Sequence, residues 1–241
     1  MLLALTACAP IESTPFPTRT PVPTEPPTAT IEWFPPTATP VILPTLEPSV
    51  TPDSRAGIGS LILEEDFSDP KNWALTNSET RSAAIANGHL TLALSGGKDT
   101  LYSLRFSPVL GNFYLELLAQ PNLCSGMDEY GIMLRTTGDL NHFRYGISCN
   151  GQAHVDRIYK GAARAFATWE KFGILPGVAP STVRLSVRAK GSDMSFFAND
   201  QLLFTVKDTL FYQGTLGLYV RTDGSSPISV NFSDLQIYSL P

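Results

Sequence analysis

The chain of 241 residues contains few of the side chains that bind metals or serve as nucleophiles, with only three histidines and three cysteines. The histidines at positions 89, 142 and 154 are scattered, and their spacing matches no zinc site. Charged residues make up 16% of the chain, and the net charge of −5 provides no basic surface for nucleic acid. We therefore expect neither a zinc site nor a nucleic-acid partner.

Sequence motifs of several common enzyme classes are also missing. The chain has no nucleophile elbow of the form Gly-x-Ser-x-Gly, no Walker loop and no dinucleotide-binding fingerprint. No stretch of twelve residues shows clean helical spacing of its apolar residues. The sequence therefore offers no sign of the nucleotide-dependent or serine-nucleophile enzymes that these motifs mark.

The N-terminus lacks a hydrophobic run that could span a bilayer, because Met1–Ala7 is far shorter than the roughly 20 residues required. Leu5-Thr6-Ala7-Cys8 nevertheless matches the bacterial lipobox, in which a lipid is attached to the cysteine sulfur. We interpret residues 1–8 as a truncated lipoprotein signal that anchors an extracytoplasmic protein to the cell membrane surface through Cys8. The alternative is a chance apolar N-terminus with an incidental cysteine.

Proline is abundant, and 13 of the 20 prolines lie between Pro10 and Pro52, where they alternate with ten threonines. Proline fixes φ and removes a backbone donor, so neither helix nor sheet can propagate through this segment. Residues 9–55 are therefore predicted to form a disordered Pro/Thr-rich spacer. At about 3.1 Å per residue it could reach on the order of 140 Å and hold the domain of residues 56–241 away from a membrane.

From Leu61 onward, short apolar runs alternate with polar residues and are interrupted by turn-forming residues. Asn199-Asp200, between two apolar runs, indicates a tight hairpin. We predict an all-β fold, an antiparallel two-sheet jelly-roll sandwich that acts as a monomer. The predicted strands are Leu61–Asp66, His89–Leu94, Leu101–Phe106, Phe113–Ala119, Tyr130–Thr136, His142–Cys149, Ala153–Tyr159, Val183–Ala189, Met194–Ala198, Leu202–Val206, Leu216–Arg221 and Ile228–Tyr238.

Several short motifs follow one another in the order and spacing of a known fold. They are Glu65-Asp66-Phe67-Ser68-Asp69-Pro70 with Trp73, Asn87-Gly88-His89-Leu90, Asp128-Glu129-Tyr130-Gly131-Ile132-Met133-Leu134-Arg135, Asn141-His142-Phe143-Arg144-Tyr145, Gly214-Thr215-Leu216-Gly217-Leu218 and Val230-Asn231-Phe232-Ser233-Asp234-Leu235. Together they resemble concanavalin A-like lectin/glucanase (laminin-G-like) jelly-roll domains over nearly all of 61–239. The resemblance implies two stacked antiparallel sheets and, in many members, a sugar-binding surface on a concave face. It does not imply catalysis, because the superfamily includes lectins, hydrolases and structural domains.

Laminarinase-type hydrolases of this fold carry Glu-x-Asp-x-x-Glu on one strand, because a retaining mechanism needs two carboxylates about 5 Å apart. That motif is absent here. The acidic runs Glu64-Glu65-Asp66 and Asp128-Glu129 place neighbouring carboxylates on opposite faces of a strand, so neither forms such a pair. Carboxylates distant in the sequence could still meet in space. Because the motif is absent, we expect no enzyme activity. A glycoside hydrolase whose site cannot be recognised in the sequence is one alternative.

Sugar-binding sites stack aromatic rings on the sugar and place polar side chains around its hydroxyl groups. Arg135 and Tyr145 are the first candidates, as family-like positions on adjoining strands, and Trp169 follows because it lies outside any obvious alternating strand. The remaining candidates are Tyr130, Phe143, Arg184 and Asn199. Each aromatic could instead belong to the core. The predicted function is non-catalytic binding of a polysaccharide or glycan, and a structural or protein-interaction module is the other alternative.

Two cysteines remain once Cys8 is assigned to the lipid. Cys124 and Cys149 lie at the outer ends of neighbouring predicted strands, since the chain reverses near Thr137–Leu140 between them. In an exported protein, such a pair predicts a disulfide. Two free buried thiols are the alternative.

The resemblance also implies a possible structural calcium ion, since many members of the superfamily hold one where the first and last strands meet. The matching residues here are Glu65, Asp66 and Asp234, whose carboxylate oxygens are the hard ligands that calcium prefers. Ordinary acids at strand ends are the alternative. No other cofactor is expected.

Overall fold

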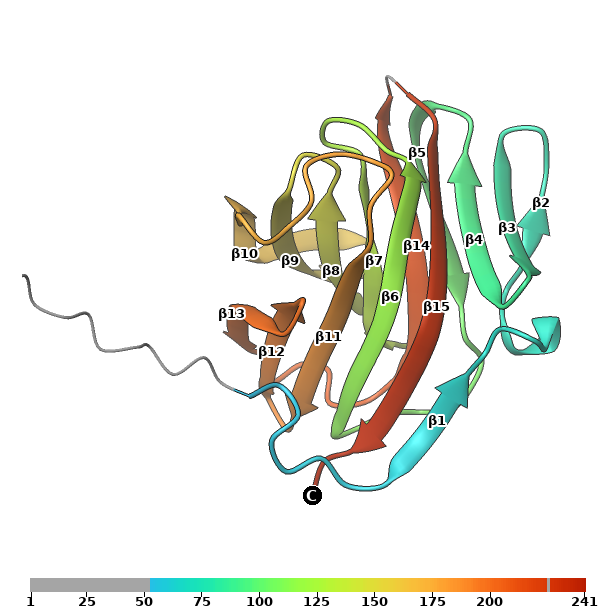
Figure 1. Cartoon of the computed structure of the whole chain (residues 1–241). Helices are drawn as coiled ribbons and strands as arrows, with labels where there is room; N and C mark the ends of the chain where they lie inside the picture. Colours follow the sequence, from blue (N-terminus) through green and yellow to red (C-terminus); the bar gives the residue numbers. More distant parts are fainter. Residues whose placement is uncertain (1–52, 225) are drawn as a thin grey trace, which may run out of the picture. The chain divides into compact units, whose positions relative to one another are not determined.

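Figure 1 presents the computed structural model of the protein, which describes residues 53–224 and 226–241. The chain divides into two units, Met1–Glu47 and Pro48–Pro241, and every described residue belongs to the second. The lipobox with Cys8, and all of the predicted spacer before residue 53, lie outside the described residues. Among the described residues, no helix has the length and apolar character needed to cross a membrane.

Two antiparallel sheets form a sandwich, and the larger has nine strands (Figure 1). Eight of them follow the order β13-β12-β11-β6-β15-β4-β3-β2, while β1 pairs with β15. The strands of this sheet are β1 (Leu61–Glu65), β2 (Thr76–Asn77), β3 (Arg81–Ala86), β4 (His89–Leu94), β6 (Phe113–Leu123), β11 (Val183–Lys190), β12 (Asp193–Ala198), β13 (Gln201–Lys207) and β15 (Ile228–Ser239). Strand β15 thus pairs with three strands. It pairs with β6 along one side, and with β4 and then β1 along the other.

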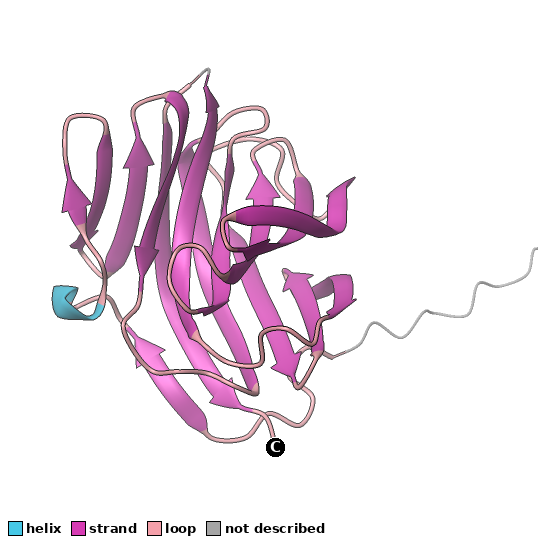
Figure 2. Ribbon diagram, turned by 180° about the vertical axis from the view of Figure 1, so that it is seen from behind, coloured by secondary structure: helices cyan, strands magenta, loops and turns pink. Residues whose placement is uncertain are grey.

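The second sheet has six strands in the order β10-β9-β8-β7-β14-β5. They are β5 (Gly97–Leu104), β7 (Glu129–Thr136), β8 (His142–Ser148), β9 (Gln152–Tyr159), β10 (Ala162–Lys171) and β14 (Thr215–Gly224). The regular helix in the described part of the chain is one short 3-10 turn, η1 (Pro70–Asn72), coloured cyan in Figure 2. The predicted all-β, two-sheet antiparallel architecture is confirmed.

Every predicted strand is present, but three strands were missed: β2, β3 and β10. The sequences of β3 and β10 are rich in alanine, so they lack the alternation of large apolar and polar residues that marks a half-buried strand. Strand β10 lies at the edge of its sheet, and its pairing with β9 contains two irregularities. An exposed edge strand needs no regular apolar face, which explains why β10 shows no alternation in the sequence.

Side chains alternate between the core and the outer face along the central strands. In β11, Val183, Leu185 and Val187 are buried, whereas Arg184 and Arg188 lie partly exposed on the outer face. The inner faces of the two sheets pack on each other and form one continuous apolar cluster. Burying each Val, Leu or Phe of this kind stabilises the fold by about 1.5–3 kcal/mol, so the sandwich depends on this alternation.

The predicted hairpin at Asn199-Asp200 joins β12 to β13. Both residues have positive φ, 46° and 66°, as a two-residue turn of this type requires. The Asn199 side-chain oxygen accepts a hydrogen bond from the Arg184 backbone N–H at 2.9 Å, and Asp200 lies 3.5 Å from the Arg184 guanidinium. Asn199 and Asp200 of the turn therefore bind Arg184 of the neighbouring strand β11 in the nine-stranded sheet.

The chain enters the sandwich over the outer face of the nine-stranded sheet. Ser54 is buried, and the Arg55 guanidinium forms a bidentate ion pair with Glu116 of β6, from Nη2 to Oε1 at 2.5 Å and from Nε to Oε2 at 3.0 Å. Arg188 of β11 donates to the Ala56 carbonyl oxygen at 2.6 Å. Residues 54 and 55, predicted to belong to the spacer, are thus already packed on the sheet.

The predicted disulfide between Cys124 and Cys149 is confirmed, with Cα atoms 5.4 Å apart. Its position differs from the expected one, because Cys124 follows β6 and Cys149 follows β8, and these strands belong to different sheets. The bond therefore ties the two layers together at one end of the sandwich.

Replacing both cysteines with serine should lower the free energy of unfolding by about 3 kcal/mol, because the bond closes a loop of 25 residues. Urea denaturation of the domain and of its Cys124→Ser/Cys149→Ser variant measures this loss. A reducing agent should destabilise the parent domain by a similar amount and leave the variant unchanged. Equal stability of the two proteins under oxidising conditions would contradict the prediction.

Candidate functional site

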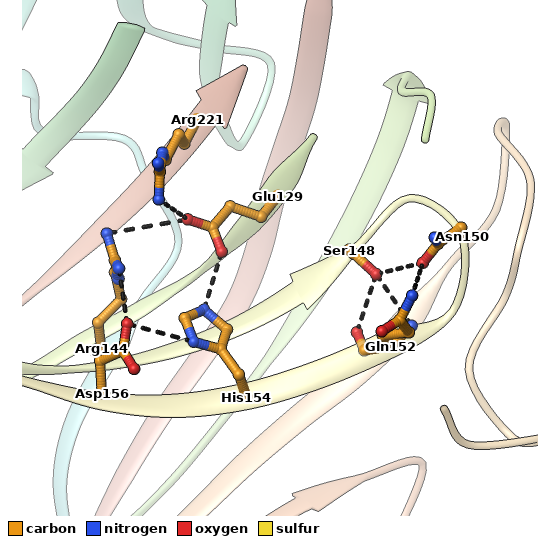
Figure 3. Close-up of polar contacts among 8 residues, drawn as sticks. All are labelled: Glu129, Arg144, Ser148, Asn150, Gln152, His154, Asp156 and Arg221. Carbon is orange, nitrogen blue, oxygen red and sulfur yellow. Dashed lines mark hydrogen bonds and ion pairs between the residues drawn. The ribbon is translucent and has the colours of Figure 1, made fainter. Parts of the chain in front are cut away.

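A group of charged side chains gathers on the outer face of the six-stranded sheet, over strands β7, β8, β9 and β14 (Figure 3). The group consists of Glu129, Arg144, His154, Asp156 and Arg221, which we call the charge network. Strand pairing brings them together, since Arg144 lies opposite Asp156 and Arg221 opposite Glu129. Side chains from four strands thereby meet on one surface.

The imidazole of His154 lies between the two carboxylates. Its Nε2 is 2.8 Å from Glu129 Oε2, and its Nδ1 is 3.3 Å from Asp156 Oδ2. Arg144 spans the same two acids, at 2.7 Å from Asp156 and 3.8 Å from Glu129. Arg221 approaches Glu129 Oε1 at 3.4 Å. Glu129 therefore faces three cationic groups, and it is almost completely buried.

Electrostatics keeps both acids ionised and favours the protonated imidazole. Burial alone would lower the pKa of His154, but hydrogen bonds and charge from Asp156 and Glu129 raise it overall. Burial likewise acts to raise the pKa of each carboxyl, yet His154 and Arg144 lower that of Glu129 and bring that of Asp156 to about 2. An imidazolium with two N–H donors satisfies both of its neighbours at once.

Two glycines make room for this network. A Cβ atom at Gly146 would collide with the Tyr219 hydroxyl and with His154 Nε2, so only glycine fits there. A Cβ atom at Gly131 would collide with the backbone of Tyr145. Tyr219 is buried, and its hydroxyl has no hydrogen-bond partner among the described residues. The close approach of His154 to Glu129 thus depends on the missing side chain at Gly146.

Trp169 of the edge strand β10 covers the network. Its ring stacks on His154 with the ring centroids 4.0 Å apart and an angle of 28° between the planes. Trp169 remains partly exposed, while His154 is buried beneath it. A ring over a protonated imidazole adds a cation–π attraction to the ion pairs.

Two hollows open beside the network, and Arg221 lines both. The larger has a volume of about 660 Å³ and lies among Lys98 and Thr100 of β5, Arg144, Arg221 and Ala163. The smaller, of about 150 Å³, lies between Trp169 and Glu129. The larger volume is within the range of small-molecule sites, and its wall mixes hydrogen-bond donors with acceptors.

A second polar group, drawn at the right of Figure 3, supports the turn between β8 and β9. The Ser148 hydroxyl donates to Asn150 Oδ1 at 2.6 Å and accepts from the Gln152 backbone N–H at 2.9 Å. Gln152 Nε2 donates to the same Asn150 oxygen at 3.2 Å. These side chains satisfy one another, so we assign them to the turn and not to a site.

Three of the predicted sugar-binding aromatics belong to the core and are not accessible to a glycan. Tyr130, Phe143 and Tyr145 have at most 1% of their surface exposed. The Tyr145 ring packs on Phe196 of the opposite sheet at 5.1 Å, and its hydroxyl donates to the Phe197 carbonyl oxygen at 3.0 Å. They alternate with the outward-facing residues of β7 and β8, which places them between the sheets.

The predicted polar residues also lie away from the charge network. Arg135 is buried, and its guanidinium donates to the carbonyl oxygens of Phe211 at 2.8 Å and Gly111 at 3.3 Å, so it anchors two loops. Arg184 and Asn199 belong to the hairpin region of the nine-stranded sheet. Of the seven predicted sugar-binding residues, the structure places only Trp169 at the charge network.

The predicted calcium ligands are engaged in other contacts. Glu65 is buried, and it accepts from Arg105 Nη2 at 3.0 Å and from Trp73 Nε1 at 3.2 Å. Asp66 accepts from the Ser68 backbone N–H, and Asp234 from the Ser233 hydroxyl. Within 53–224 and 226–241, no group of three or more His, Cys, Asp or Glu side chains could hold a metal ion. Calcium at Glu65 would have to displace Arg105.

Sequence reasoning missed most of the charge network, although a signal for it was present. In β8, Phe143, Tyr145 and Ile147 face the core, so Arg144 and Gly146 face outward. The same alternation in β9 puts His154 and Asp156 outward. Following this alternation across neighbouring strands would have grouped the polar residues. Glu129 forms no pair with its sequence neighbour Asp128, and its partners come from other strands.

Comparison with known proteins identifies the fold but no family. No protein-family profile and no characterised protein matches the sequence. Among solved structures, a carbohydrate-binding module, CBM66 of Bacillus subtilis, has a TM-score of 0.55 at 18% identity, covering 70% of this chain and 96% of that one. A β-glucanase of Bacillus licheniformis has a TM-score of 0.57 at 11% identity, covering 76% and 99%.

A third solved structure is the catalytic domain of an endo-1,3-β-glucanase (laminarinase) from Thermotoga petrophila, with a TM-score of 0.53 at 12% identity, covering 75% of this chain and 97% of that one. At such identities the similarity concerns the fold alone, and the matched proteins include both binding modules and enzymes. The described domain has the concanavalin A-like lectin/glucanase jelly-roll fold.

The raised pKa of His154 makes stability depend on pH in a defined direction. The imidazolium stabilises the fold fully below the unfolded pKa of about 6.5, and this stabilisation is lost as the pH rises through the folded pKa. Replacing His154 with glutamine should remove this part of the pH dependence. Urea denaturation across about pH 6 to 9 measures it.

His89→Gln serves as the matched control, since His89 lies on β4 of the other sheet. It should retain the parent pH dependence. In NMR titrations, the His154 ring should deprotonate above the usual histidine range, whereas burial lowers the pKa of His142 to about 4. Identical pH profiles for the parent and His154→Gln would contradict the prediction.

Proposed function

We propose that the sandwich domain binds carbohydrate without catalysis, on the outer face of the six-stranded sheet. The observation that supports this most directly is the hollow of about 660 Å³ beside the charge network. Arg144 and Arg221, which carry N–H donors, and Asp99 and Asp223, which carry acceptor carboxylates, are among the residues that line it. Sugars present hydroxyl groups that both donate and accept, so a wall of mixed polarity suits them.

An aromatic ring stands at the edge of this surface. Trp169 is partly exposed, and its stacking on His154 fixes the orientation of its ring. Sugar rings pack their CH faces on aromatic side chains, and a ring already held in place loses little conformational freedom when the sugar binds. The ion pairs beneath it fix Arg144 in the same way. The surface is therefore preorganised for a ligand.

The state of the carboxylates favours binding over hydrolysis. A glycosidase needs one carboxylic acid with a raised pKa to protonate the leaving group. Here His154 and Arg144 lower the pKa of both Glu129 and Asp156. Both acids are also occupied by ion pairs, and Glu129 is buried. Neither is suited to act as a general acid at neutral pH.

Similarity of fold is consistent with this proposal. The Bacillus subtilis structure is described as a carbohydrate-binding module, and the two glucanases act on polysaccharides. Loss of all glycan binding would instead favour the alternative, a structural or protein-interaction module.

The proposal also includes the position of the domain outside the membrane. A lipid on Cys8 and a proline-rich spacer would hold the domain at a distance from the outer surface of the membrane, where polysaccharides occur. Single sites on an open surface bind weakly, so we expect dissociation constants on the order of 10–1000 µM. Several copies on one membrane would compensate through avidity.

Replacing Trp169 with alanine should weaken glycan binding by about fivefold or more, because stacking of this kind contributes about 1 kcal/mol or more. The test is a glycan array with residues 53–241, followed by calorimetry on the glycans that bind. Tyr212→Ala is the matched control, since Tyr212 is 52% exposed in the loop before β14, at the other end of that strand from Arg221. Melting temperatures check that both variants fold. Unchanged affinity in Trp169→Ala would place the ligand elsewhere.

The lipid anchor is tested separately. In its native cell the full chain should fractionate with membranes, and Cys8→Ser should release it to the soluble fraction. Thr6→Ser keeps a small residue in the lipobox and should remain with the membranes. Soluble behaviour of the unaltered chain would refute the anchor and leave the binding proposal unaffected.

A further inference from the structure

The larger hollow carries more positive than negative side chains on its wall. Lys98, Arg144 and Arg221 line it, against Asp99 and Asp223. Asp99 is also held from the side by Arg81, at 2.8 Å. One negative charge of the wall is therefore neutralised by a cation outside it.

The charge network behind the wall does not reverse this balance. Arg144 is paired with Asp156 at 2.7 Å, and His154 contacts Glu129 at 2.8 Å. The wall and the network contain four cations, when His154 is protonated, and four carboxylates, and Arg81 beside Asp99 supplies a fifth cation from outside them. The cations are Lys98, Arg81, Arg144, Arg221 and His154, and the carboxylates are Asp99, Asp223, Glu129 and Asp156. One positive charge is left over.

That charge is accessible at Arg221 and Lys98. The Arg221 side chain is half exposed, and within the described part of the chain its guanidinium makes one contact, to Glu129 at 3.4 Å. A guanidinium has five N–H donors, so most of them remain available to a ligand. Lys98 is exposed on β5 and forms no ion pair within 4.0 Å among the described residues.

We infer that the hollow binds an acidic saccharide, one whose sugar ring carries a carboxylate or sulfate group. The anionic group lies between Arg221 and Lys98, and the ring hydroxyls face Thr100 and Asp223. The fork of an arginine matches two oxygens of such a group, and hydrogen bonds between charged partners are the stronger ones. This inference rests on the proposed function, because it names the ligand class of the same surface.

The experiment compares acidic oligosaccharides with their neutral counterparts by calorimetry on residues 53–241. The carboxylate probes are oligomers of polygalacturonate, alginate and hyaluronan, each beside its carboxyl-reduced form, and the sulfate probe is dextran sulfate beside dextran. At least one acidic probe should bind about tenfold or more tightly than its neutral form. The difference should shrink as salt is raised from about 0.05 to 1 M, because screening weakens exposed charge pairs. Preference among the probes distinguishes carboxylate from sulfate.

Arg221→Gln and Lys98→Gln should each weaken binding of the acidic probe by about 10- to 100-fold, and Lys98→Gln should change binding of neutral glycans much less. Lys190→Gln is the matched control, because it removes one exposed positive charge from β11 of the other sheet. It should leave the affinity for the acidic probe unchanged. Lys98 lies outside the charge network, so that variant remains informative even if Arg221→Gln lowers the melting temperature.

The outcomes separate this inference from the proposed function. Equal binding of acidic and neutral forms, or binding of neutral glycans alone, overturns the inference and leaves carbohydrate binding intact. Absence of binding to every glycan, acidic or neutral, overturns both. Equal losses in Lys190→Gln and Lys98→Gln would show non-specific charge attraction and would also overturn the inference.

Discussion

The buried carboxylate of Glu129 is the group on which the outer face of the six-stranded sheet depends. Removing a carboxylate from water costs several kcal/mol unless opposite charges and hydrogen bonds replace the solvent. At Glu129, His154, Arg144 and Arg221 do so from three different strands. The acid therefore fixes the positions of its partners, and with them the wall of the hollow. Loss of His154, the nearest partner, would leave this buried charge with only the longer contacts to Arg144 and Arg221.

The same strands supply both the core and the network, because successive side chains point to opposite faces. Tyr130 is directed inward where Glu129 is directed outward, and Tyr145 inward where Arg144 is directed outward. A change of register by one residue would bury the charges and expose the aromatics. Packing of the core thus holds the charged side chains in place, and Gly146 provides the space in which they meet.

Because the same strands supply both the core and the charge network, only part of the structure could be predicted from the sequence. Apolar alternation predicted the strands and the two-sheet fold. The pairing of Cys124 with Cys149 was predicted from an even number of cysteines in a protein expected to be exported, although the strands that precede them lie in different sheets. The prediction that Tyr145 binds a sugar was wrong. In the sequence, a tyrosine that packs on Phe196 in the core cannot be distinguished from one that packs on a sugar. Partners of Glu129 could not be identified without the order of the strands, since β14 and β9 lie more than twenty residues away in sequence. Strand β10, with Trp169, follows no alternation at all.

The residues that precede β1 lie on the side of the domain opposite to the hollow. Arg55 and Ala56 are held on the outer face of β6 and β11, through Glu116 and Arg188. The hollow lies on the outer face of the other sheet. In a two-layer sandwich these faces are directed oppositely, so residues 54–56 and the hollow lie on opposite sides of the domain. The ion pair of Arg55 with Glu116 keeps Arg55 and Ala56 on the nine-stranded sheet, so these residues do not cover the outer face of the six-stranded sheet.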